Sequence, residues 1–138
     1  MNKKMYKHTG GCICGEVNYT VSLDEIPRVF NCHCIDCRKK MGGVITIIQL
    51  RENTLEVDEN KLSKYTHSGG SKNIITKSFC KKCAAPLTTY VEKGGISYLY
   101  AGLLDDISLL KNAKHIFFCK LKRYIFIICM YFFILCIY

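Results

Sequence analysis

Residues 1–8 lack any apolar run that could act as a secretory signal, so we do not expect this chain to be exported. A chain that is not exported keeps its thiols reduced, and closely spaced cysteines then favour metal ligation over disulfides. The cysteine content, 10 of 138 residues or about 7%, also falls below that of a secreted disulfide scaffold. We therefore expect a cytoplasmic protein whose cysteines bind metal.

No segment before residue 103 has a sustained helical period, which excludes a mainly helical domain. The length of 138 residues fits one domain with a real core. Strand patterns recur instead, at 16–21, 44–50, 55–57, 62–66, 74–79, 87–91 and 96–100. Lys93-Gly94-Gly95 could turn a hairpin between the last two of these segments. The sequence predicts a mostly β fold with few or no helices.

Acidic residues are scarce: 11 Asp and Glu stand against 20 Lys and Arg, for a formal net charge of +9. Nucleic acid, an acidic membrane surface or a small anionic substrate could each account for the basic excess. Two zinc–thiolate sites with charges of about −2 and −1 would lower it to roughly +6. Because the basic residues are scattered, tryptophan is absent and no long basic arm precedes the strands, we do not expect a nucleic-acid partner.

Two cysteine pairs at metal-ligand spacing lie far apart in the sequence. Cys12 and Cys14 form a C-x-C motif, and Cys80 and Cys83 form a C-x-x-C motif. Pairs presented on turns can converge into a closed, structural four-thiolate zinc site, as in zinc-ribbon-like folds. The alternative is four independent core cysteines, since free cysteine is readily buried. Neighbouring glycines and lysines favour the zinc site over that alternative.

Three more cysteines, Cys32, Cys34 and Cys37, lie within six residues of each other. Three protein ligands plus water or substrate are the pattern of a catalytic zinc, which could accept a substrate thiolate or polarise a carbonyl. These three cysteines (the central trio) are therefore candidate metal ligands and candidate catalytic residues. The alternative is a second structural site completed by Cys119 or His67.

Basic residues follow the central trio directly. Arg38 and Lys39 are candidates for binding the carboxylates of a substrate, a task for which the arginine fork is well suited. The alternative is a solvated basic turn that balances the negative charge of the site.

The composition changes near the C-terminus. Residues 124–138 are uncharged and mostly apolar, and they follow a basic cluster at 120–123. A membrane-spanning helix needs about 20 apolar residues, so this segment is short for one. A membrane segment, a buried strand or helix, and a segment foreign to the working fold all remain open. We treat 5–119 as the zinc-binding domain and 120–138 as an atypical hydrophobic tail, the one place where a membrane contact is possible.

Taken together, the motifs resemble the glutathione-dependent formaldehyde-activating enzyme and centromere protein V family. The resemblance rests on 11–19, 32–39, Phe79-Cys80-Lys81-Lys82-Cys83, 102–106 and His115-Ile116, in that order along the chain. It implies a mostly β fold with two zinc ions, a structural one on Cys12, Cys14, Cys80 and Cys83 and a catalytic one on the central trio. The activity it implies is the joining of glutathione and formaldehyde to S-hydroxymethylglutathione, classed as a carbon–sulfur lyase.

The sequence departs from the family pattern in two places. Ala84 follows the C-x-x-C motif where the family has glycine, and a positive φ there would cost alanine on the order of 1 kcal/mol. The polar, tryptophan-containing continuation expected after His115-Ile116 is replaced by the hydrophobic tail. The competing hypotheses are therefore a zinc-stabilised binding module, as centromere protein V illustrates, and an inactive relative with a disrupted C-terminus.

Overall fold

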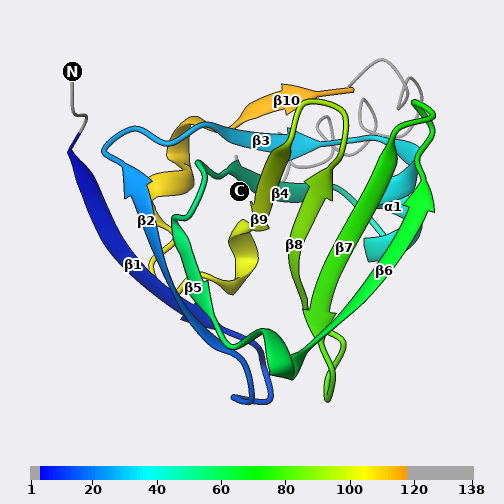
Figure 1. Cartoon of the computed structure of the whole chain (residues 1–138). Coiled ribbons are helices and arrows are strands. Elements are labelled where there is room, and N and C mark those ends of the chain that lie inside the picture. Colours follow the sequence, from blue (N-terminus) through cyan, green and yellow to red (C-terminus); the bar gives the residue numbers. More distant parts are fainter. Residues whose placement is uncertain (1–3, 118–138) are drawn as a thin grey trace, which may run out of the picture.

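Figure 1 shows a computed structural model of the chain, which describes residues 4–117. The strands are β1 (Met5–Gly11), β2 (Asn18–Asp24), β3 (Val29–Cys32), β4 (Ile45–Gln49), β5 (Leu55–Val57), β6 (Leu62–Ser68), β7 (Ile74–Cys80), β8 (Pro86–Val91), β9 (Ile96–Tyr100) and β10 (Lys114–Ile116). The helical segments are α1 (Ile35–Met41) and the short 3₁₀ helices η1 (Glu59–Lys61), η2 (Ala101–Leu103) and η3 (Ser108–Asn112). The prediction of a mostly β fold with few helices is confirmed.

The hydrophobic tail at 120–138 and Cys119 lie outside the described residues. The predictions made for them, a membrane segment and a fourth ligand for the central trio, concern that part of the chain. Within residues 4–117, no helix combines the length and hydropathy needed to cross a membrane.

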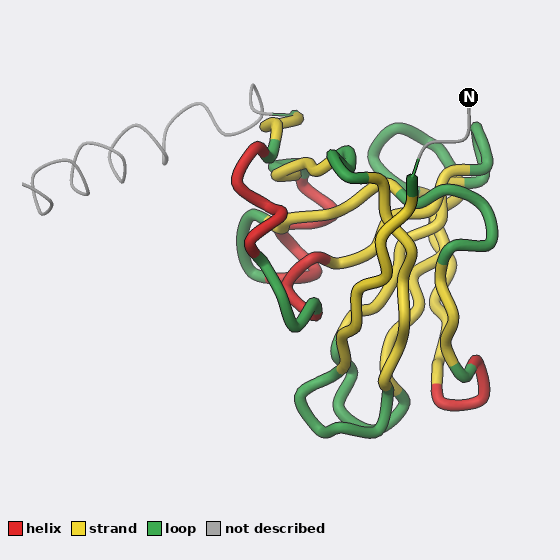
Figure 2. Tube along the Cα trace, turned by 90° about the vertical axis from the view of Figure 1, so that its left-hand side faces the viewer, coloured by secondary structure: helices red, strands yellow, loops and turns green. Residues whose placement is uncertain are grey.

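The strands form two sheets. The smaller has the order β1-β2-β5 and is antiparallel throughout. The larger has the order β10-β3-β4-β9-β8-β7-β6, and its pairs are antiparallel except for β10 and β3. The predicted hairpin is present, because β8 and β9 pair antiparallel from Val91 and Ile96 onwards. Figure 2, turned by 90°, shows the strands as the body of the molecule and the helical segments at its margins.

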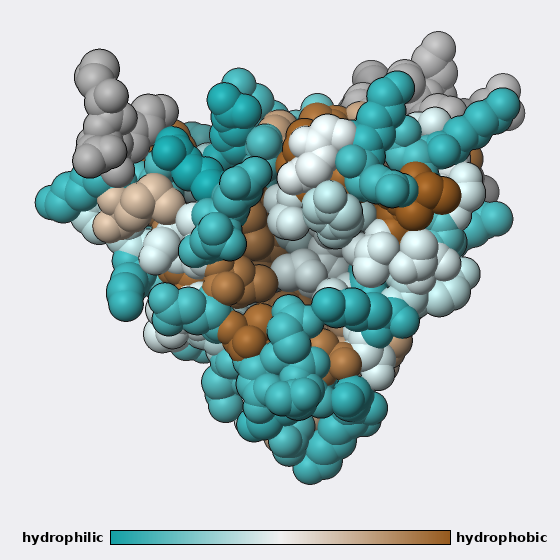
Figure 3. Space-filling model, viewed as in Figure 1, coloured by the Kyte–Doolittle hydropathy of each residue, from teal (hydrophilic) through white to brown (hydrophobic). Residues whose placement is uncertain are grey.

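The main core fills the space between the sheets. Val21 of β2 contributes to it from the small sheet, in the strict alternation that the sequence predicts for that strand. Ile48, Leu87 and Leu99 contribute from the large sheet and are almost fully buried. Figure 3 shows apolar side chains in the hollow between the sheets, with hydrophilic side chains at the loops below. Cys80 belongs to this core, so the end of β7 is anchored on both sheets.

The sequence analysis did not identify a helix at residues 35–41, where the structure has α1. It has seven residues, none of them buried, so it has no apolar stripe that a helical period could reveal. Its ends are instead fixed by local contacts. The Cys34 Sγ accepts a hydrogen bond from the Cys37 amide at 3.3 Å, and the Gly42 amide, at a φ of 77°, donates to the Arg38 carbonyl at 2.8 Å.

Candidate metal centres

The two outer cysteine pairs meet in space. Cys12 and Cys14 lie in the loop after β1, Cys80 ends β7 and Cys83 lies in the turn that follows, and the four Sγ atoms are all within 4.8 Å of one another. The Cys12 and Cys14 sulfurs are 3.4 Å apart and those of Cys14 and Cys80 are 3.8 Å apart. Zinc–sulfur bonds of about 2.3 Å in a tetrahedron place sulfurs about 3.8 Å apart. These four residues, which we call the outer site, therefore fit zinc.

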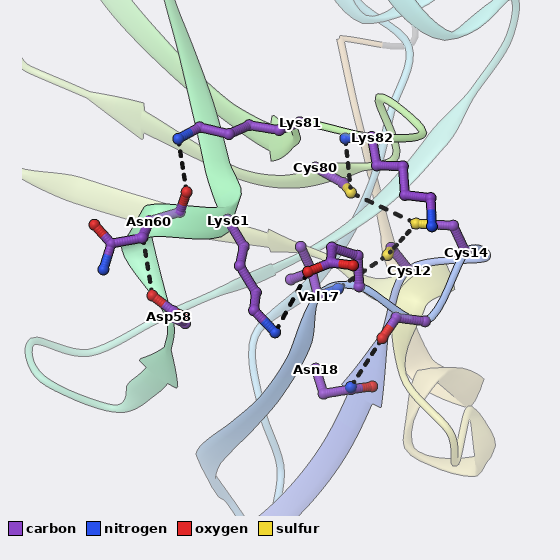
Figure 4. Close-up of polar contacts among 12 residues, drawn as sticks. Cys12, Cys14, Val17, Asn18, Asp58, Asn60, Lys61, Cys80, Lys81 and Lys82 are labelled. Atoms are coloured by element: carbon purple, nitrogen blue, oxygen red, sulfur yellow. Dashed lines mark hydrogen bonds and ion pairs between the residues drawn. The ribbon is translucent and has the colours of Figure 1, made fainter.

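Each loop of the outer site directs backbone amides at its sulfurs. The Val17 amide donates to Cys12 Sγ at 3.2 Å, and the Lys82 amide donates to Cys80 Sγ at 3.4 Å (Figure 4). Such hydrogen bonds stabilise thiolates. In both loops the residue directly after the last cysteine has a left-handed backbone: Gly15 at a φ of 74° and Ala84 at 58°.

The electrostatics of the outer site favour a thiolate at Cys12 and at Cys83, while burial and the hydrogen bonds with Cys12, Cys83 and Cys80 raise the pKa of Cys14 to about 12, against the lowering effect of the Glu16 amide. Burial raises the pKa of Cys12, but hydrogen bonds from the Val17 amide and from neighbouring thiols outweigh it and lower that pKa to about 6. The Ala85 amide likewise lowers the pKa of Cys83. Metal binding needs thiolates, so both loops prepare the site for it. In Figure 4 two nearby lysines have other partners: Lys61 Nζ lies 3.6 Å from the Glu16 carboxylate, and Lys81 Nζ donates to the Asn60 carbonyl at 2.6 Å.

The positive φ of Ala84 predicts that glycine at this position stabilises the fold. Because glycine adopts this conformation without steric cost, Ala84→Gly is expected to raise the free energy of unfolding by about 1 kcal/mol. Ala85→Gly is the matched control: Ala85 does not have positive φ, so added flexibility should lower stability. Urea titrations of both variants in excess zinc measure this. A loss of stability in both would show that Ala84 is not strained.

The central trio also converges. Cys32 ends β3, Cys34 caps α1 and Cys37 lies in its first turn, and their three Sγ atoms are within 4.8 Å of one another. Among residues 4–117, no other histidine, cysteine or carboxylate completes this group. His67 is therefore not its fourth ligand in this structure. A set of three soft donors fits zinc with one position left for water or substrate.

The trio concentrates negative charge on Cys34. Hydrogen bonds from the Cys32 and Cys37 thiols, together with the Cys37 amide, lower the pKa of Cys34 to about 2. Hydrogen bonds with Cys32 and Cys34 raise the pKa of Cys37, and the hydrogen bond with Cys34 raises the pKa of Cys32. Cys34 is thus the thiolate around which the other two donors gather, and a metal ion would displace their protons.

A histidine pair fixes the strand that leads into the trio. His33 is buried, and its Nε2 lies 2.8 Å from Nδ1 of His115 on β10. The His33 amide donates to the Ile116 carbonyl at 3.1 Å. His115 therefore packs β10 against β3. The pair holds the backbone on both sides of His33, and with it the spacing of Cys32 and Cys34.

Buried side chains from two neighbouring strands cover the trio. Ile45 and Ile47 of β4 and Tyr100 of β9 form a small apolar cluster with Cys32, and Cys34 and Cys37 pack against it. Sequence analysis missed Tyr100, since only the pairing of β4 with β9 brings it to the trio. The cluster excludes water from one side of the three sulfurs.

Arg38 and Lys39 are exposed on α1, and within residues 4–117 neither side chain makes an ion pair, so their role in substrate binding stays a prediction.

Lys77 of β7 was missed by sequence analysis and is only 4% exposed. It pairs in register with Thr89 of β8, and no carboxylate in the described part of the chain forms an ion pair with it. Its spacing of two residues from apolar Ile75 and from apolar Phe79 was the available indication.

Two comparisons with known proteins agree with this architecture. A crystal structure of a Rhodobacter sphaeroides protein, solved in a structural genomics programme, is similar to 78% of this chain and 99% of its own, with a TM-score of 0.60 and 20% identity. At that identity the similarity shows the fold alone. The family model described as "glutathione-dependent formaldehyde-activating enzyme" matches residues 7–120, a range that contains both cysteine clusters. The chain therefore belongs to the glutathione-dependent formaldehyde-activating enzyme family.

Proposed function

We propose that this protein is a zinc-dependent carbon–sulfur lyase-type enzyme that joins a thiol such as glutathione to a small aldehyde such as formaldehyde. The observation that carries the proposal is the central trio. Among the described residues it has only three protein ligands, whereas the outer site has four cysteines and needs no further donor. Membership of a family named for this chemistry supports the choice of substrates.

The two sites would have different tasks. Cys12, Cys14, Cys80 and Cys83 would hold a structural zinc, and Cys32, Cys34 and Cys37 a catalytic one. Zinc bound at the trio supplies an open coordination position and Lewis acidity. The histidine pair keeps the trio in place, and Ile45 and Ile47 keep water from its inner side. Because both sites need reduced thiols, we place the enzyme in the cytoplasm.

The reaction needs no redox cofactor. The thiol loses its proton and its sulfur forms a bond to the aldehyde carbon. The π pair of the carbonyl moves to the oxygen, and a proton from solvent completes the hydroxyl. All atoms of thiol and aldehyde are retained, so positioning and charge stabilisation are what the protein must supply.

An anionic thiol suits the charges near the trio. Glutathione carries two carboxylates, and Arg38 and Lys39 are available on α1 to bind them. Lys77 adds a buried ammonium group on the large sheet, where an anion would offset the cost of burying it.

Zinc content and catalysis together test the proposal. We expect two zinc ions per purified chain, and acceleration of glutathione–formaldehyde adduct formation over the uncatalysed reaction in NMR exchange measurements. One zinc per chain would mean that the trio is empty and would favour a structural module or an inactive relative. Two zinc ions without acceleration would reject these substrates.

A further inference from the structure

We infer that Tyr100 is a catalytic residue, whose hydroxyl donates a hydrogen bond to the aldehyde oxygen while the thiol adds to the carbon. This inference rests on the proposed function and adds a residue to it. It is carried by the position of Tyr100 beside the trio and by the hydrogen bond that its hydroxyl already accepts.

Tyr100 lies at the end of β9, opposite Ile47 of β4. Its side chain is 4% exposed and packs in the cluster that contains Cys32, against which Cys34 and Cys37 also pack. Tyr100 therefore lies beside the three cysteines, and we place the aldehyde oxygen between its hydroxyl and the trio.

The hydrogen bonds of the hydroxyl leave its proton for a ligand. A phenol has one proton to donate and lone pairs that accept. The Thr89 hydroxyl donates to the Tyr100 oxygen at 3.0 Å, which uses a lone pair and orients the group. Among residues 4–117, no hydrogen bond uses the Tyr100 proton. A buried donor without an acceptor is unfavourable, so an oxygen placed beside the trio would be bound there.

The hydroxyl keeps its proton near neutral pH, because a tyrosine phenol ordinarily has a pKa of about 10. The group is thus a neutral donor at physiological pH, as a hydrogen bond to a developing oxyanion requires.

The role in the step follows from the charge that develops. As the sulfur–carbon bond forms, the carbonyl π pair becomes a lone pair on oxygen, and the negative charge there grows. The hydrogen bond from Tyr100 strengthens with that charge, so it stabilises the transition state more than the bound aldehyde. Solvent then supplies the proton of the product hydroxyl, and Tyr100 keeps its own.

Tyr100→Phe tests this assignment, because it removes the oxygen and keeps the ring. We expect kcat for adduct formation to fall about 100-fold, with KM for glutathione changed by less than about twofold. Tyr90→Phe is the matched control: Tyr90 lies on the neighbouring strand β8, is 42% exposed and does not belong to the cluster that contains Cys32. Its kcat should stay within about threefold of the unsubstituted protein.

Thr89→Val provides a second test that does not alter the aromatic ring. Loss of the orienting bond should lower kcat about tenfold at unchanged zinc content. An unchanged kcat in Tyr100→Phe would overturn the inference. If Tyr100→Phe does not fold, an unchanged kcat in Thr89→Val would overturn it. So would a rise in KM with kcat preserved, which would indicate packing only. Failure of the unsubstituted protein to accelerate the reaction would instead reject the proposed function, and this inference with it.

Discussion

Cys80→Ser is expected to abolish the folded state of this protein. Cys80 is 1% exposed, ends β7 and belongs both to the main core and to the outer site. A structural four-cysteine zinc site contributes apparent binding free energies of about 10–16 kcal/mol. That is as large as the whole stability of a typical domain, about 5–15 kcal/mol. We therefore expect loss of the native far-UV circular dichroism spectrum and of the cooperative thermal transition.

The size of this effect follows from where the outer site lies. It joins the loop after β1 in the small sheet to the end of β7 in the large sheet. Cys14 and Cys80, which meet there, are 66 residues apart in the sequence. The same exchange at Cys34 is the control, because it also replaces a thiol by a hydroxyl. A Cys80→Ser protein that keeps its zinc content and melts within a few degrees of the unsubstituted chain would show that the outer site is not structural.

Local patterns explain what could be predicted from the sequence. A short strand over 55–57 was expected, and β5 covers Leu55–Val57. Alternation over 16–21 and the glycine turn after Lys93 likewise identified β2 and the β8–β9 hairpin. These features depend on neighbours along the chain. The convergence of the cysteine clusters was also predictable, since their spacing is that of metal ligands.

What the sequence could not show depends on pairing between distant strands. Tyr100 reaches the trio only because β9 pairs with β4, and His115 reaches His33 only because β10 pairs parallel to β3. Neither contact leaves a periodic pattern. The helix α1 escaped prediction because its cap is a thiol and no residue of it is buried. The conformation of Ala84 could be anticipated only from the resemblance. The family has glycine at this position, which suggested a positive φ, and the structure has a φ of 58°.

Cys34→Ser is expected to keep the fold and remove the activity. Serine is among the preferred helix N-caps, so its hydroxyl can replace Cys34 Sγ as acceptor for the Cys37 amide and α1 should persist. A hydroxyl is a poor ligand for zinc beside two thiolates, so the trio should lose its metal while the outer site keeps its own. We expect one zinc per chain instead of two, a melting temperature within a few degrees of the unsubstituted protein, and a fall in kcat of at least about 100-fold.

Cys34→Ala separates the two roles of this side chain. It removes the cap as well as the ligand, and should cost about 1 kcal/mol more than Cys34→Ser. If Cys34→Ser instead melts as completely as Cys80→Ser, the trio stabilises the fold and the proposed enzyme loses its main support. If it keeps both zinc ions and full activity, Cys34 is not a ligand. The proposal requires separate effects: Cys80 must determine folding, and Cys34 must determine catalysis in a chain that still folds.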